Sequence, residues 1–177
     1  MVFYLLTGTP GTGKTSIGRE LSNKGYSIIY LNDCVGDDYL RLEEGCKVVD
    51  PLVLGEKIKN SLKPGCVVEG HLAHLLGIAG VVIVLRTAPD VLRFRLTEKG
   101  FSNPKSEENV EAEALDVVLI EALELHKQVF EIDTTEQSAA ESASNVIKIM
   151  EGETTGFTPG TVSWLNDYFD EKLKRGL

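Results

Sequence analysis

The chain has 177 residues, 42% of them apolar, which is enough to bury one hydrophobic core but too few for two large α/β domains. It carries 27 acidic and 18 basic residues, a formal net charge of −9, which argues against a general nucleic-acid binder and suits a basic partner. Its three cysteines form no disulfide or metal-ligand pattern, and no apolar run approaches the ~20 residues of a membrane span. We expect one cytoplasmic domain that does not enter a membrane.

Short apolar, β-branched runs alternate with longer helical patterns along residues 1–150. The runs are typical of buried strands and lie at residues 2–7, 27–31, 66–69, 81–86 and 129–133. Helical patterns separate them at residues 15–24, 51–62, 89–99, 107–127 and 136–150. This alternation predicts an α/β domain built on a doubly wound five-stranded parallel sheet.

The remaining residues, 151–177, are predicted to form a linker and a helix. Residues 152–160 are rich in Gly, Thr and Pro, as linkers and turns are. Apolar side chains then recur at helical spacing, at Val162, Leu165, Phe169 and Leu173. We expect an amphipathic helix that docks on the domain through this face.

Residues 8–15, Gly-Thr-Pro-Gly-Thr-Gly-Lys-Thr, have the spacing of a phosphate-binding loop and lie between a predicted strand and a predicted helix. Glycines let backbone N–H groups point at phosphates, and the helix N-terminus adds its positive dipole. A plain strand-to-helix turn would need neither the lysine nor two of the glycines. The loop predicts a nucleoside triphosphate site in which Lys14 reaches the β- and γ-phosphates and Thr15 ligates Mg²⁺. The expected contacts are Gly11, Gly13, Lys14, Thr15 and Ser16.

Two polar intervals interrupt the alternation. Residues 30–50 form a connection longer than usual, and residues 98–109 contain Gly100 and Pro104 as bend points. Both could be variable surface loops. However, they follow predicted strands at the edge where doubly wound sheets bind ligands. We therefore expect an acceptor-binding insertion at about 30–50 and a short lid at about 98–109.

Several segments together resemble the nucleoside monophosphate kinases, and most closely the adenylate kinase isoenzyme six family with its archaeal relatives. The resemblance covers residues 1 to about 150 and is carried by residues 5–14, 67–71, 84–86 and 95–96 and by the pair Lys105 and Asn109. It implies a P-loop nucleoside monophosphate kinase fold with a very short lid over ATP. It also implies both nucleotide kinase and ATPase activity, and a role in late maturation of the small ribosomal subunit and its rRNA processing.

The chain departs from that family at two positions. Lys99 precedes Gly100 and Phe101 where the family commonly has Arg in its lid, and Glu69 follows the third strand where the family usually has Asp. A lysine cannot make the two-pronged contact of arginine on a phosphate. The phosphate contact from this lid position is therefore expected to be weaker.

Glu69 ends a predicted strand, where a carboxylate can hold Mg²⁺ or orient a nucleophilic water. His71 resembles a histidine of the family and could position water or a phosphate oxygen, although a surface or capping role stays open. Arg86 and Arg95 flank the connection to the lid, and either guanidinium could neutralise the transferring phosphoryl group. We expect Lys14, Glu69, His71 and Arg95 to be the catalytic residues, with Lys99 on the bound ATP and Thr15 and Glu69 on Mg²⁺.

The acceptor site has no motif of fixed spacing, and Asp33 and Arg41 are our candidates for it. Taken together, the sequence predicts an ATP- and Mg²⁺-dependent kinase that converts ATP and AMP to two ADP, with ATPase activity. An alternative is an ATP-driven assembly factor that binds a basic small-subunit ribosomal protein, its kinase activity being incidental. A kinase acting on shikimate or a sugar acid is a third possibility, but residues 30–50 lack an evident basic cluster for a carboxylate.

Overall fold

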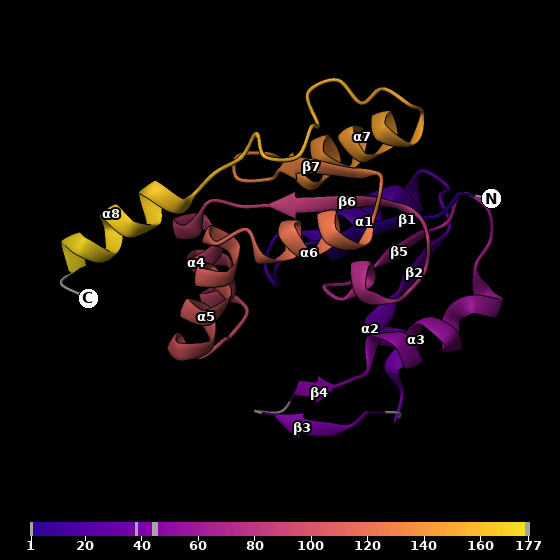
Figure 1. Ribbon diagram of the computed structural model, residues 1–177, viewed down its shortest axis with the longest axis horizontal. Helices are drawn as coiled ribbons and strands as arrows, with labels where there is room; N and C mark the ends of the chain where they lie inside the picture. The colour runs from indigo at the N-terminus through magenta and orange to yellow at the C-terminus, as the bar shows by residue number, and fades with distance from the viewer. Residues whose placement is uncertain (1, 38, 44–45, 176–177) are drawn as a thin grey trace.

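The computed structural model of the chain describes residues 2–37, 39–43 and 46–175. Its centre is a parallel five-stranded sheet in the order β2-β5-β1-β6-β7 (Figure 1). The strands are β1 (Tyr4–Thr7), β2 (Ile28–Tyr30), β5 (Val67–Glu69), β6 (Val81–Arg86) and β7 (Val129–Asp133). This confirms the predicted doubly wound α/β sheet.

Helices cover both faces of the sheet. They are α1 (Lys14–Asn23), α2 (Leu31–Val35), α3 (Pro51–Ile58), α4 (Pro89–Glu98), α5 (Asn103–Ala114), α6 (Val117–Leu125), α7 (Ala139–Met150) and α8 (Leu165–Arg175), with short 3₁₀ turns η1 (Lys59–Ser61) and η2 (Ala73–Leu75). No helix among the described residues is long and apolar enough to cross a membrane.

Neighbouring side chains of β1 show how the two faces are filled. Leu5 belongs to a buried cluster with residues of α3 and α6, whereas Leu6 belongs to a second cluster with residues of α1 and α7. Both side chains are fully buried. A sheet covered on both faces accounts for strands with apolar residues at successive positions, because each residue meets a helix layer on its own side.

The insertion after β2 is more regular than the sequence suggests. It begins with α2 and continues into an antiparallel hairpin of β3 (Arg41–Glu43) and β4 (Cys46–Val48). The hairpin projects beyond α2 and α3, away from the parallel sheet (Figure 1). Positions 38, 44 and 45 of the insertion lie outside the described residues. Strands this short carry little periodicity, which is why the pattern of residues 30–50 did not reveal them.

The region expected to be a loop at 98–109 is largely helical. Only residues 99–102 connect α4 to α5, and Pro104 lies in the first turn of α5, where its missing N–H costs nothing. The single helix expected at 107–127 is instead divided into α5 and α6. Asp116 separates them with a left-handed φ of 57°, and its carboxylate pairs with Arg86.

The C-terminal segment crosses the edge strand β7, and its helix packs on α4 and α5. We call residues 157–162 the strap: its Phe157 carbonyl accepts a hydrogen bond from Glu131 N at 2.9 Å, so it lies along the outer edge of β7. Helix α8 then packs against α5 (Figure 1). The docking face is not the expected one. Tyr168 is buried against α4 and α5 with Trp164 beside it, whereas the expected contacts Leu165, Phe169 and Leu173 are exposed.

Arg86 at the end of β6 is a buried arginine bound to three carboxylates. Its Nε donates to Glu113 Oε1 at 2.8 Å and its Nη1 to Glu131 Oε1 at 2.6 Å, and Nη2 pairs with Asp116. Burial alone would lower the pKa of Arg86, but Glu113 and Asp116 raise it. The guanidinium is therefore held within the fold as a structural cation.

Replacing Arg86 with methionine is expected to destabilise the fold by about 3–5 kcal/mol, because Glu113 and Glu131 would be left as unpaired buried charges. The matched control is Arg93→Met, which breaks the more exposed pair with Glu107 on α5 and is expected to cost about 1 kcal/mol or less. Urea unfolding followed by circular dichroism measures both. Equal losses in the two variants would contradict the structural role of Arg86.

Candidate functional site

The phosphate loop joins β1 to α1 at the carboxyl edge of the sheet. Gly8 has a φ of 139°, and a Cβ there would lie 2.5 Å from the Leu85 carbonyl oxygen, so the tight turn requires glycine. Gly13 is the N-cap of α1 in a left-handed conformation, and no side chain caps this helix. Its first N–H groups are therefore left for an anion, as expected of a phosphate site.

Lys14 is folded back onto this loop. Its Nζ donates to the carbonyl oxygens of Gly8 at 2.7 Å and Thr9 at 2.9 Å, and only 8% of the residue is exposed. Burial lowers the pKa of Lys14 to about 8, against the opposing effect of the Glu69 carboxylate. The loop thus holds its cation at the place where the phosphates would lie.

Glu69 at the end of β5 faces the start of α1. Thr15 Oγ1 lies 3.4 Å from Glu69 Oε1, so the two residues proposed for Mg²⁺ are brought together. Burial raises the pKa of Glu69, whereas Lys14 lowers it, and Asp33 is near enough to raise it further. A hydroxyl and a carboxylate are oxygen ligands of the kind that Mg²⁺ prefers. The donor set therefore fits this ion, although no group of three or more His, Cys, Asp or Glu side chains forms among the described residues.

The two histidines after β5 have different surroundings. His74 is buried, with Nδ1 2.8 Å from Thr7 Oγ1 and Nε2 3.0 Å from Glu121 Oε2, and desolvation lowers its pKa. His74 therefore links β1 to α6. His71 is exposed at the surface. Its pKa is nevertheless lowered to about 4, mainly because the surrounding protein desolvates the ring and also because Lys14 is positively charged.

Arg95 and Lys99, the two cations expected to act on the phosphates from α4 and the residue after it, differ in their position relative to the phosphate loop. Arg95 Nη2 donates to the carbonyl oxygens of Thr134 at 2.8 Å and Thr135 at 3.2 Å, which directs it to the segment after β7 rather than to the phosphate loop. Lys99 is exposed at the end of α4, and its charge is felt by Lys14, whose pKa it lowers. Of these two cations, Lys99 is the one whose charge acts on Lys14.

The segment after β7 contacts the phosphate loop directly, since Thr134 Oγ1 donates to the Thr12 carbonyl at 3.0 Å. A pocket opens beside it, lined by Asp133, Thr135, Glu136, Gln137, Glu141 and Trp164. Trp164 reaches this pocket from the C-terminal region. The sequence gave no signal for this position, because Trp164 is a single aromatic residue outside residues 1–150, which carry the family resemblance.

The two candidates for the acceptor site, Asp33 and Arg41, lie in different parts of the insertion. Asp33 lies on α2 with an exposed side chain, close enough to Glu69 and Tyr30 to raise the pKa of both. Arg41 is exposed on β3 of the projecting hairpin. The structure thus associates Asp33 with the Lys14, Thr15 and Glu69 cluster, and Arg41 with the hairpin.

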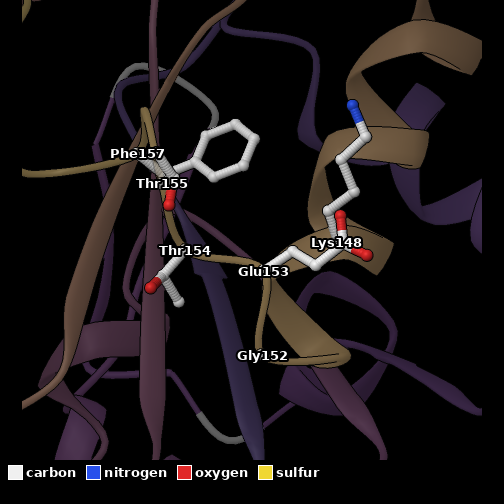
Figure 2. Close-up of a pocket in the computed structure, with 6 residues that line it drawn as sticks. All are labelled: Lys148, Gly152, Glu153, Thr154, Thr155 and Phe157. Atoms are coloured by element: carbon white, nitrogen blue, oxygen red, sulfur yellow. The ribbon is translucent and has the colours of Figure 1, made fainter.

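A further pocket lies apart from these residues. Figure 2 shows it between Lys148 on α7 and the segment that leads to the strap, with Phe157 on the opposite wall. Its remaining lining residues are Gly152, Glu153, Thr154 and Thr155. None of the predicted site residues lines this pocket.

The fold and the loop define a class: a P-loop α/β protein of the small-kinase type. Two solved structures share this fold, at sequence identities too low to show more than that. The YorR protein of Bacillus subtilis, in complex with phosphorylated GDP, has a TM-score of 0.60 at 16% identity and covers 86% of this chain and 97% of its own. Shikimate kinase from Acinetobacter baumannii has a TM-score of 0.57 at 18% identity, and the match covers 88% of this chain and 96% of the shikimate kinase chain.

Sequence comparison narrows the class to a family. Residues 5–116 match the family model of an AAA domain, AAA_18. Proteins named "Putative adenylate kinase" are similar over nearly the whole chain: 41% identity in Archaeoglobus fulgidus with 93% of each chain covered, 39% in Methanosarcina barkeri with 91% of this chain and 96% of the relative, and 38% in Pyrococcus abyssi with 94% and 92%. The chain belongs to the archaeal adenylate kinase family.

His71 gives a direct test of the site's electrostatics. Because its pKa is lowered, the ring is expected to stay neutral down to about pH 4, where a histidine in an unstructured peptide protonates near 6.5. The unfolded chain then binds more protons than the folded one between these values, so this residue lowers stability as the pH falls from 6.5 toward 4. NMR titration of the histidine ring protons measures the midpoint; a His71 midpoint near 6.5 would contradict the crowded environment.

Proposed function

We propose that the protein is an ATP-dependent nucleoside monophosphate kinase that converts ATP and AMP to two ADP. The observation that carries the proposal is the grouping of Lys14, Thr15 and Glu69 at the carboxyl edge of the sheet, with Lys99 approaching from the lid. The names of the archaeal relatives support a nucleotide kinase. Membership of this family favours a nucleotide as acceptor over shikimate, despite the shared fold.

Catalysis in this site is chiefly positioning and neutralisation of charge. On binding ATP, the Lys14 ammonium would leave the carbonyl oxygens of Gly8 and Thr9 for the β- and γ-phosphates, aided by backbone N–H groups at Gly11 and Gly13. Ser16 would add a contact in the first turn of α1.

The metal ligands and the lid would complete the site. Thr15 and Glu69 would hold Mg²⁺, which when bound neutralises phosphate charge. Closure of the lid would bring Lys99 to the phosphates. It would also move Arg95 off the carbonyl oxygens of Thr134 and Thr135 and exclude water from the reacting groups.

The acceptor and the donor base would occupy opposite sides of the loop. We assign AMP to the insertion at about 30–50, where Asp33 approaches Glu69 and Arg41 supplies a cation. The base of ATP would enter the pocket lined by Asp133, Thr135 and Trp164. Its acidic lining suits the amino group of a base and repels phosphates, which favours this orientation of the nucleotide.

ATPase activity would follow when water takes the acceptor's place. Glu69 and the neutral His71 would orient that water at the γ-phosphate, since both lie beside Lys14. The low pKa keeps the His71 ring neutral at neutral pH, so its unprotonated ring nitrogen can accept a hydrogen bond from the water.

ATP with AMP is expected to yield ADP faster than ATP alone is hydrolysed, because an ordered acceptor displaces water from the in-line position. A coupled assay across the nucleoside monophosphates measures this and identifies the preferred base. Lys14→Ala is the control and is expected to lower both rates by about 100-fold or more while the circular dichroism spectrum is unchanged. If no monophosphate accelerates ATP consumption, the kinase proposal fails.

A second candidate function, an ATP-gated assembly factor for a basic small-subunit ribosomal protein, is favoured by the surface of α6. Val117, Ile120 and Leu123 are exposed there, next to Glu121 and Glu124, and the chain carries a net charge of −9. Most acidic residues of 107–124 already pair within the chain, for example Glu113 with Arg86 and Glu111 with Lys172. Apolar contact on α6 would therefore provide more of the affinity than charge alone.

This candidate predicts capture of a basic ribosomal protein in a nucleotide-dependent complex, because a nucleotide shifts binding only through different affinities for the free and bound forms. Pull-down from lysate with and without ATP, repeated at high salt, tests it. Ile120→Glu is expected to weaken capture, whereas Phe94→Glu, at an exposed apolar residue on α4, is the control. Recovery of no ribosomal protein under any nucleotide condition would leave only the metabolic kinase.

A further inference from the structure

A chain of buried polar contacts starts at the strap. Glu131 on β7 directs Oε2 outward, where it accepts hydrogen bonds from the backbone N–H groups of Gly160 at 2.9 Å and Thr161 at 3.1 Å. Its other oxygen accepts the 2.6 Å hydrogen bond from Arg86. One carboxylate therefore joins the C-terminal segment to the structural cation of the core.

The same chain continues to the phosphate loop through α5. Glu113 accepts from Arg86 Nε at 2.8 Å and from Thr87 N at 3.0 Å through Oε1. Its other oxygen, Oε2, accepts a hydrogen bond from the hydroxyl of Thr9 at 2.6 Å. Glu113 is 2% exposed and Thr9 2%, so neither has water as an alternative partner.

Thr9 is the residue of the loop on which this chain acts. Its carbonyl oxygen accepts from Lys14 Nζ at 2.9 Å and from Thr12 Oγ1 at 2.9 Å. Fixing the Thr9 side chain therefore fixes the peptide group that Lys14 must leave when phosphates arrive. The negative charge of Glu113 also supports the ammonium form of Lys14.

We propose that the Glu131–Arg86–Glu113–Thr9 chain couples the C-terminal strap to the phosphate loop, and that Glu113 and Glu131 are positioning residues for phosphoryl transfer. Both carboxylates act through the peptide of Thr9 rather than on the substrate. The proposal rests on the proposed function only in that the loop binds a triphosphate. Because all members are buried and paired, a shift of one must be accommodated by the others.

The single tryptophan of the chain reports on this coupling. Trp164 follows the strap by two residues and packs with α4 and α5, so its fluorescence senses the position of the C-terminal segment. Magnesium tripolyphosphate is the probe, because it can fill the phosphate loop but has no base to touch Trp164. We expect its binding to change the emission of Trp164 in the full chain.

Thr9→Val and Thr9→Ser form the decisive pair of variants. Valine keeps the volume of threonine but removes the hydroxyl. We therefore expect tripolyphosphate to bind at least about fivefold more weakly, a factor at the lower end of allosteric coupling, as measured by calorimetry. The response of Trp164 fluorescence is also expected to disappear. Serine keeps the hydroxyl and is expected to restore both. An unchanged Trp164 response in Thr9→Val, or no response in the parent chain, would overturn the proposal.

Glu131→Gln tests the far end of the chain, with Glu153→Gln, an exposed residue before the strap, as the matched control. We expect Glu131→Gln to weaken tripolyphosphate binding about fivefold or more and to raise the KM for ATP more than it lowers kcat. Equal affinities in the two folded variants would overturn the coupling. These binding measurements need no acceptor, so loss of the kinase proposal would not affect their outcome.

Discussion

The buried guanidinium of Arg86 is the interaction on which the arrangement of this molecule depends. It ends β6, the strand between β1 and β7, and binds carboxylates from α5, from the turn before α6 and from β7. A guanidinium has five donors in a fixed plane, so it can fix the angles at which these elements meet in a way that apolar packing cannot. Asp116, at the break between α5 and α6, supplies one of these carboxylates.

The cation of the phosphate loop, unlike Arg86, has no carboxylate hydrogen-bonded to it among the described residues. Here a buried ammonium, Lys14, has backbone carbonyl oxygens rather than a bonded carboxylate as its partners. Carbonyl dipoles satisfy the donor without neutralising it, so the positive charge stays available to a phosphate. The neighbouring carboxylate Glu69 lies beside Thr15, where a cation can join the two. The loop therefore presents a positive charge and uncapped helix N–H groups to an anion.

The sequence predicted the sheet because its buried strands carry the strongest signal available, consecutive β-branched residues with turn residues around them. It predicted the phosphate loop for a different reason: the glycines and Lys14 are needed together by one chemistry only. Arg86 was ambiguous, because an arginine at a strand end fits either a phosphate or a carboxylate network. Its partners Glu113 and Glu131 lie far along the chain and share no spacing that could have identified them.

The C-terminal helix shows how an apolar pattern can mislead. Leu165, Phe169 and Leu173 recur at helical spacing, yet the buried residue of α8 is Tyr168. The ring of Tyr168 has the area to fill the space between α4 and α5, and Lys172 lies over it, 4.8 Å from its centroid, while pairing with Glu111. The spacing of apolar residues alone cannot predict a contact that combines burial of an aromatic ring with a cation over its face.

The packing of α8 bears on how α4 and α5, which border the expected lid, can move. Its buried cluster contains residues of α4, α5 and the C-terminal region and is separate from the two clusters that cover the sheet. Elements that share a core move more readily as a unit than apart. Glu113 lies on that unit and also holds Thr9 of the phosphate loop. Any movement of α5 relative to the sheet must therefore break or turn about the hydrogen bonds that join Glu113 to Thr9, Thr87 and Arg86.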